Sequence, residues 1–101
     1  MFSLFPGQFT PVGFVEISLD ATTAVELADH FPDASAGKPK YALVQAITQN
    51  VLWRDDGIAP TSSLGQTMAK DITPQGFLGN LNTVQFIAAT GTAKLRVSFC
   101  S

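Results

Sequence analysis

The chain has 101 residues, of which 14% are charged and 46% are apolar, and its formal net charge is −2. A chain of this length can bury one modest core and leaves no room for a second domain. Its six cations are scattered, so the clustered positive charge that a nucleic-acid partner requires is missing. Ordinary domains carry about 25% charged residues. We therefore expect apolar surface that is covered by copies of the chain or by another protein; the alternative is a monomer with an uncharged polar surface.

The first twelve residues are apolar, but prolines and a glycine interrupt them and they contain no lysine or arginine. They do not fit a signal peptide, and no stretch of the chain approaches the ~18 apolar residues of a membrane span, so we expect no membrane partner. Phe2, Phe5 and Phe9 recur every three or four residues, so their side chains could anchor the segment on an apolar surface. This spacing predicts a surface arm over residues 1–12, followed by a single domain over residues 13–101.

The chain after the arm begins with a clear strand pattern. Val15, Ile17 and Leu19 alternate with polar residues, which predicts a half-buried strand. The next segment is ambiguous, because Thr23 and Glu26 fit a capping box that opens a short helix, while a short strand or an irregular segment fits equally well. A loop rich in proline and small residues follows it.

Further strands are expected along the rest of the chain. Residues 41–48 (YALVQAIT) are apolar on both faces, which predicts a central strand covered on both sides. Residues 51–56 (VLWRDD) resume extended structure after a short polar break, which predicts a hairpin or a bulged long strand. Short strands are also expected within 66–71 and 83–88, and residues 93–100 alternate as a strand with one buried face.

About seven or eight short strands with turn signals roughly every 8 to 12 residues predict an all-β fold, an antiparallel β-sandwich or jelly roll. No long amphipathic helix competes with this interpretation. The only cysteine, Cys100, excludes an intrachain disulfide and a cysteine metal cluster. Its place on the polar side of the last strand predicts a surface thiol, and the low cysteine content fits synthesis in a reducing cytoplasm.

The most conspicuous polar stretch is Arg54, Asp55, Asp56 and Gly57. Asp-Asp-Gly at the end of a strand predicts a turn, because Asp and Gly tolerate positive φ and an aspartate can cap the turn. A calcium loop would need more oxygen ligands at regular spacing. In extended geometry Arg54 and Asp56 point to the same side, so we expect Arg54 to pair with a carboxylate across a sheet or a subunit boundary.

Nothing in the sequence predicts catalysis. His30 is the only histidine, and no serine lies in a G-x-S-x-G context. The carboxylates are dispersed, so no pair is marked as an acid and a base. We expect no enzymatic activity and no catalytic, cofactor or metal site. Trp53 and Tyr41 could form a sugar-stacking platform, although each lies in an apolar strand where an aromatic ring usually packs inward.

Two segments, YALVQAITQNVLWRDDGIAPTSSLGQTM and GNLNTVQFIAATGTAKLRVSF, carry a resemblance. They are similar to a group of small structural proteins of tailed bacteriophages, in which Y-A-L-I-Q-A is followed by V-R-[WY]-R-D-D-G-x-x-P-T, G-x-L, F-I and G-[TA]-A-K-L-x-V. Leu52 replaces the arginine before the aromatic residue, and the first 40 residues match no motif. The matching residues are Tyr41, Ala42, Leu43, Gln45, Ala46, Trp53, Arg54, Asp55, Asp56, Gly57, Pro60, Thr61, Gly79, Leu81, Phe86, Ile87, Gly91, Ala93, Lys94, Leu95 and Val97.

The resemblance implies a non-enzymatic virion component, made in the host cytoplasm and assembled as a small oligomer on a head, neck or tail. We expect a capsid decoration or cement protein at junctions of major capsid subunits, with a trimer favoured by three-fold symmetry. The alternatives are a neck or tail adaptor and a carbohydrate-binding module of a tail or fibre. The expected interface residues, which bridge neighbours or fix a corner, are Phe2, Phe5, Phe9, Arg54, Asp55 and Asp56.

Overall fold

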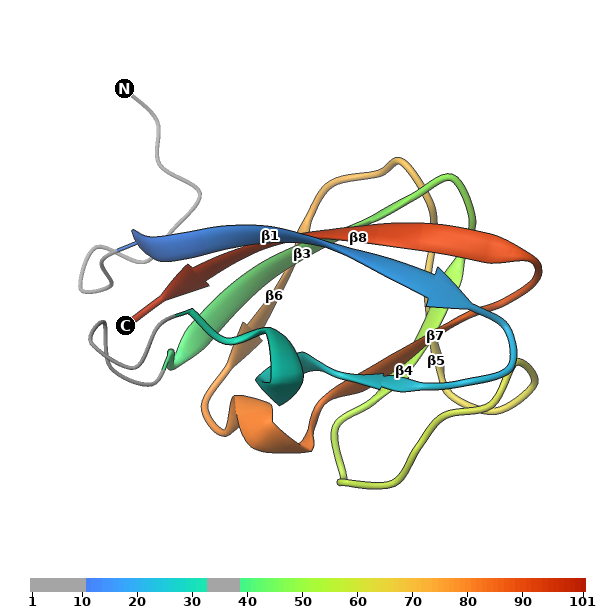
Figure 1. Ribbon diagram of the computed structural model, residues 1–101, viewed down its shortest axis with the longest axis horizontal. Helices are drawn as coiled ribbons and strands as arrows, with labels where there is room; N and C mark the ends of the chain where they lie inside the picture. Colours follow the sequence, from blue (N-terminus) through green and yellow to red (C-terminus); the bar gives the residue numbers. More distant parts are fainter. Residues whose placement is uncertain (1–10, 33–38) are drawn as a thin grey trace.

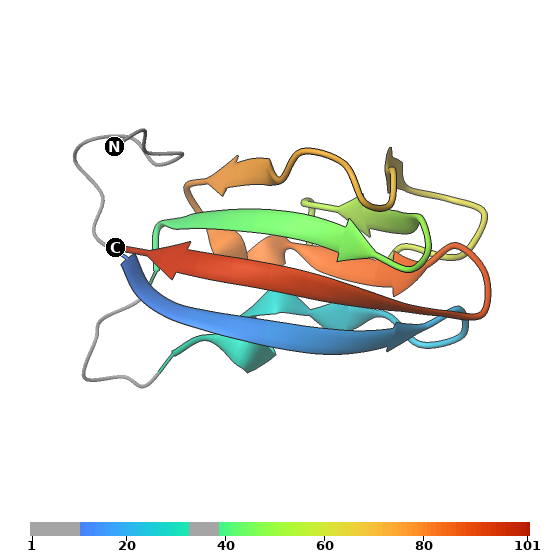
Figure 2. The same cartoon turned by 90° about the horizontal axis from the view of Figure 1, so that it is seen from above.

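The computed structural model describes residues 11–32 and 39–101, which form two four-stranded antiparallel sheets packed face to face (Figure 1). The first sheet has the order β1 (Pro11–Asp20), β8 (Thr92–Cys100), β3 (Tyr41–Ile47) and β6 (Gln75–Leu78). The second has the order β2 (Val25–Glu26), β7 (Gln85–Ala88), β4 (Val51–Arg54) and β5 (Gln66–Met68). The predicted all-β sandwich is confirmed. Figure 2 looks onto the first sheet and shows its four strands in order.

The strand pairs are nested around one loop. β1 pairs with β8, β2 with β7, β3 with β6 and β4 with β5, all antiparallel. The chain is therefore one long hairpin whose tip is the connection between β4 and β5. This hairpin is rolled up so that β8 also pairs with β3, and β7 with β4. Such nesting is the strand order of a jelly roll.

The connection between β3 and β4 differs from the prediction. A hairpin or a bulged long strand was expected, but the two strands lie in different sheets. Thr48 has φ of 81°, which turns the chain away from the first sheet. Asn50 then fixes the corner, because its carbonyl accepts from the Ala89 N–H at 2.9 Å and its side chain accepts from the Lys70 N–H at 3.0 Å. A short polar break fits both arrangements, so sequence pattern alone could not separate them.

The strand β3 is central, as predicted, but only one of its faces is covered. Ala42, Val44 and Ala46 are fully buried against the second sheet, whereas Tyr41 and Leu43 are only half-buried. The prediction of two covered faces was wrong because the second sheet packs on one side of the first sheet only. The other side, here called the outer face, keeps apolar side chains partly in contact with water.

The strand β8 follows the predicted alternation except at its end. Ala93, Leu95, Val97 and Phe99 are buried in the core. Cys100 was expected to be a surface thiol but is fully buried. It lies between strand neighbours on both sides, paired with β1 at one edge and with β3 at the other. Burial raises the pKa of this thiol.

The segment after β1 forms no capping-box helix. Asp20 caps the turn instead, since its carboxylate accepts from the backbone N–H groups of Thr22 at 2.9 Å and Thr23 at 2.8 Å. These hydrogen bonds lower the pKa of Asp20. The chain then forms β2 and the short 3₁₀ helix η1 (Leu27–His30). Within the described residues, no helix has the length and apolar character needed to cross a bilayer.

The predicted arm overlaps the fold by two residues. β1 begins at Pro11, which is paired with β8, so residues 11 and 12 of the predicted arm belong to a strand. A register shift between Pro11 and Gly13 marks a bulge at this start. Phe2, Phe5 and Phe9 lie outside the described residues.

The core contributes a testable contrast between two phenylalanines. Phe99 is fully buried and packs edge-on against Phe31, whereas Phe14 on β1 is 63% exposed. We expect Phe99→Ala to lower the free energy of unfolding by about 3–5 kcal/mol, because a cavity remains in the core. Phe14→Ala should change it by no more than about 0.5 kcal/mol. Urea unfolding of both variants measures the difference, and equal losses would contradict this assignment of the core.

Candidate functional site

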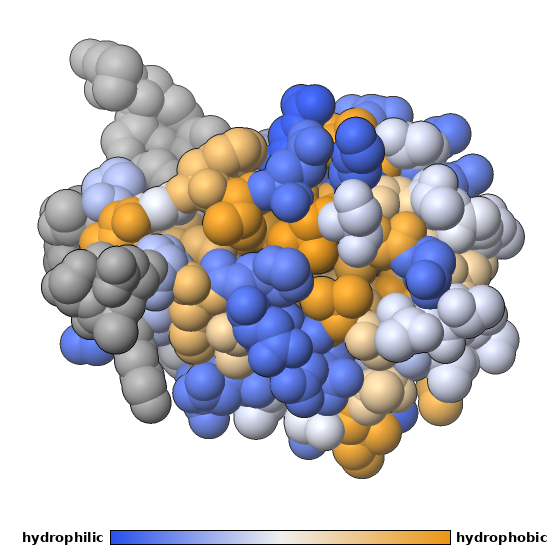
Figure 3. All heavy atoms as spheres, in the orientation of Figure 1, coloured by the Kyte–Doolittle hydropathy of each residue, from blue (hydrophilic) through white to orange (hydrophobic). Residues whose placement is uncertain are grey.

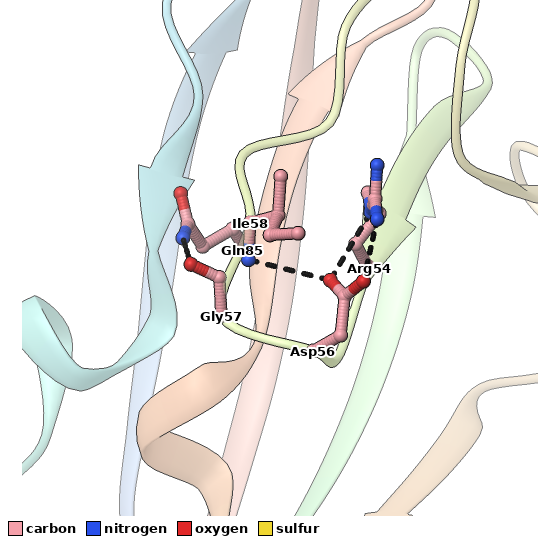
Figure 4. A network of polar contacts seen from close by, with 5 residues as sticks. All are labelled: Arg54, Asp56, Gly57, Ile58 and Gln85. Atoms are coloured by element: carbon pink, nitrogen blue, oxygen red, sulfur yellow. Dashed lines mark hydrogen bonds and ion pairs between the residues drawn. The ribbon is translucent and has the colours of Figure 1, made fainter.

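The turn after β4 is held by an ion pair within the turn itself (Figure 4). Arg54 donates from Nε to Asp56 Oδ1 at 3.1 Å, and its Nη2 pairs with Asp56 Oδ2. The same Oδ1 accepts from the Ile58 N–H at 3.3 Å. Gly57 has φ of 82°, which glycine adopts without strain. The predicted Asp-Gly turn is therefore present.

The turn is also tied to the strand beside it. The Gly57 N–H donates to the Thr83 carbonyl at 3.1 Å, and the Gln85 amide donates to the Gly57 carbonyl at 3.3 Å. Gln85, which pairs with Arg54 across β7 and β4, is the one buried polar residue in the described part of the chain. Arg54 was expected to reach a carboxylate across a sheet or a subunit boundary. It finds its partner two residues further along its own chain.

The ion pair gives the turn electrostatic support. The hydrogen bond from Arg54 lowers the pKa of Asp56, and the same contact raises the pKa of Arg54. Both groups therefore stay ionised near neutral pH. Their side chains remain 25% and 46% exposed, so solvent screens the attraction between them. The neighbouring Asp55 is exposed, and its carboxylate makes no hydrogen bond within the described residues.

A groove lies beside the turn. It has a volume of about 410 Å³ and is formed by Trp53 and Asp55, by the four residues of β6, and by residues around the 3₁₀ helix η3 (Leu81–Thr83). A second hollow of about 490 Å³ is lined by Arg54, Asp55, Asp56, Leu64, Gly65 and Gln66, so Asp55 borders both hollows.

Trp53 is half-buried in the wall of the groove. Its ring meets Phe77 edge-on with centroids 4.8 Å apart, and Phe77 meets Phe86 in the same way at 5.7 Å. The indole Nε1 is buried and has no hydrogen-bond partner within residues 11–32 and 39–101. A buried donor without a partner costs about 1–3 kcal/mol. The site therefore keeps one unused donor beside the groove.

The sugar platform of Trp53 and Tyr41 is not assembled. Trp53 contacts Phe77 on the inner face of β6, whereas Tyr41 lies over Gly76 on the outer face. A Cβ placed on Gly76 would collide with the Tyr41 hydroxyl and approach its ring to 3.0 Å. Successive residues of a strand point to opposite faces, so β6 separates the two rings.

An apolar patch that sequence reasoning did not single out lies on the outer face. It consists of Tyr41, Leu43 and Leu78 on β3 and β6, where Tyr41 pairs with Leu78, and of Phe14 on β1, which lies in the same row as Leu43 with Ser98 of β8 between them. Phe14 and Leu78 are 63% and 69% exposed, more than the other large apolar side chains of the described chain. The outward positions of β1 and β3 were readable from the alternation, but their neighbourhood depended on the strand order.

Charged side chains border this apolar patch on the same face. Arg96 Nε donates to Glu16 at 3.2 Å, and Lys94 lies 3.7 Å from the same carboxylate. Along β1, the residue pair after Phe14 and Ser98 on this face is Glu16 with Arg96, and the next is Ser18 with Lys94. Figure 3, in the orientation of Figure 1, shows the sandwich from its edge, where apolar surface is also interrupted by polar side chains. The outer face thus has an apolar part with a charged rim.

Comparisons with family models, with curated proteins and with solved structures gave no match. Within the described ranges, no three His, Cys, Asp or Glu side chains come together as a metal-binding group. The surface features that could contact a ligand or a partner are the groove, the turn and the outer face.

The ion pair of the turn predicts a pH-dependent stability difference. The pKa of Asp56 is lowered in the folded chain, so its contribution is present above the ordinary carboxyl pKa of 3.8 and is lost as the pH falls through the folded value. Asp56→Asn should therefore lower the free energy of unfolding at neutral pH, and the difference from the wild type should shrink in acid. Urea unfolding at a series of pH values measures it.

Asp55→Asn is the matched control, because it removes the neighbouring charge without removing a hydrogen bond. An equal effect of the two substitutions, or an Asp56→Asn effect that does not change with pH, would contradict the role given to the ion pair.

Proposed function

We propose that the chain is a non-enzymatic structural protein of a tailed-phage virion that decorates or cements the capsid. The observation that carries this proposal from the structure is the apolar patch of Phe14, Tyr41, Leu43 and Leu78. An apolar centre with a polar rim is the usual anatomy of a protein interface. The resemblance from residue 41 onward supplies the phage context, and the jelly roll is a fold that viral capsid proteins use, although a fold alone does not assign function.

The proposed mechanism needs no reaction. A small domain that contacts several capsid subunits adds binding free energy to the assembled shell, so a subunit can leave only after these contacts break. A sheet face suits this task because the strand register fixes the backbone, so little backbone freedom is lost on binding. In a trimer at a three-fold junction, each copy would present the same face to an equivalent neighbour.

The expected interface residues of the turn divide into two kinds. Arg54 and Asp56 satisfy each other, so they shape the corner and leave little for a partner. Asp55 is exposed and unpaired within the described residues, so in this proposal it is the member of the group that meets a neighbouring subunit. The residues Phe2, Phe5 and Phe9 belong to the same proposal as bridging contacts from the arm.

The apolar patch is tested by particle binding. Phe14→Ala should leave the domain folded and reduce its retention on purified particles of the phage that carries the sequence by at least about tenfold, a loss of about 1.4 kcal/mol. Leu64→Ala is the matched control, because Leu64 is 61% exposed but lies in the loop between β4 and β5. Co-sedimentation measures both variants. Equal retention of the two variants, or absence of the chain from intact particles, would overturn the proposal.

The arm is tested by deleting residues 1–10, which stops before β1. The shortened chain should unfold as the wild type does but form fewer oligomers or bind particles less, because the three phenylalanines of the arm are lost. Analytical ultracentrifugation and co-sedimentation measure this. Loss of folding would instead place the arm in the core. Comparing capsids that lack tails with isolated tails separates decoration from a neck or tail adaptor.

A further inference from the structure

We infer that the groove between β6 and the end of β4 binds a neutral, hydroxyl-rich ligand, namely a glycan. The groove meets the apolar patch at Leu78 and contains Asp55, but the inference does not depend on capsid decoration, because it is tested by ligand binding to the isolated chain. The volume of the groove, about 410 Å³, lies in the range of small-molecule sites, about 300–1,000 Å³. The groove combines one aromatic wall with several polar groups, which is the combination that sugar rings require.

The charge of the lining selects against anions. Asp55 is the only charged residue that lines the groove, and no lysine, arginine or histidine lies there. A phosphate or a nucleic acid would meet a carboxylate and no compensating cation. A single carboxylate is also too few oxygen ligands for calcium. A neutral ligand with hydroxyl groups can donate to Asp55 without either difficulty.

The polar groups offer both donors and acceptors. Asn80 is already oriented, because its Oδ1 accepts from the N–H and the side-chain amide of Asn82 at 3.1 and 2.9 Å. Its own NH₂ group can therefore donate to a ligand. Gln75 adds a second amide, and Asp55 adds an acceptor pair. Amides and carboxylates of this kind match neighbouring hydroxyl groups, each of which donates and accepts.

Trp53 supplies the apolar wall. Its side chain is half-buried and lines the groove, so its exposed part can stack against the C–H face of a sugar. Its Nε1 is shielded from solvent, so Trp53 serves the groove as an apolar surface and not as a donor.

The groove is preorganised by the turn. The Gly57 N–H donates a hydrogen bond to the Thr83 carbonyl at 3.1 Å, and the Gly57 carbonyl accepts one from the Gln85 side-chain amide at 3.3 Å. These hydrogen bonds link the end of β4 to the segment around η3. Trp53 is held edge-on by Phe77 of β6. The walls come from two segments that are far apart in the sequence, residues 53–55 and 75–84, and these contacts fix them to one another. Little freedom would be lost when a ligand binds.

The test uses the full chain and its own reporter, since Trp53 is the only tryptophan. The protein is first applied to a printed array of neutral and acidic glycans, and the bound glycans are then titrated while Trp53 fluorescence is followed. We expect binding to neutral glycans and a saturable change in emission. Binding to none of them, or to acidic glycans only, would overturn the inference.

Two matched variants test whether the glycan binds in the groove. Asp55→Asn should weaken the affinity by at least about tenfold, because the carboxylate is replaced by a poorer acceptor. Asp71→Asn is the matched control: it makes the same change in the loop between β5 and β6, outside the groove, and asparagine also tolerates the φ of 57° found there. Circular dichroism confirms that both variants are folded. Equal affinities of the two variants would place the glycan elsewhere and overturn the assignment.

Discussion

The structure depends on the burial of one face of the first sheet against the second. β8 and β3 form the middle of the first sheet, and their inward residues, among them Val44, Leu95, Val97 and Phe99, are fully excluded from water. Burial of apolar area is the main term that stabilises such a small domain. Since only one layer covers the sheet, its other side remains open, and the apolar patch is a direct result of this two-layer arrangement.

The turn after β4 shows how a polar group can be structural in a chain with few charges. Its ion pair is exposed and screened, so the hydrogen bonds to Thr83 and Gln85 matter as much as the charge. Together they fix the direction in which Trp53 and Asp55 leave the strand. The position of the groove is therefore set by groups that do not line it, such as Gln85 and Arg54.

Periodicity predicted the sandwich because the long strands β1, β3 and β8 of the first sheet alternate more and less buried residues. It also predicted the Asp-Gly turn, since the chemistry of that turn is local. It failed at Thr48, where one residue with positive φ moves the chain to the other sheet. It failed again at Cys100, because burial of an outward position depends on the residues beside it on the neighbouring strands, here Pro11 and Tyr41. The groove and the apolar patch join residues that are distant in sequence, and a single sequence contains no signal for such neighbours.

The nested pairing has a practical consequence for engineering. Of the connections between successive strands, the one from β4 to β5 joins neighbours within one sheet, while the others pass from one sheet to the other. Its residues 61–64 are exposed and closed by hydrogen bonds between Thr61 and Leu64 at 3.0 and 3.2 Å. A peptide inserted between Ser62 and Ser63 would lengthen the tip of the rolled hairpin without parting any strand pair. This loop is the place to display a foreign epitope or an affinity tag.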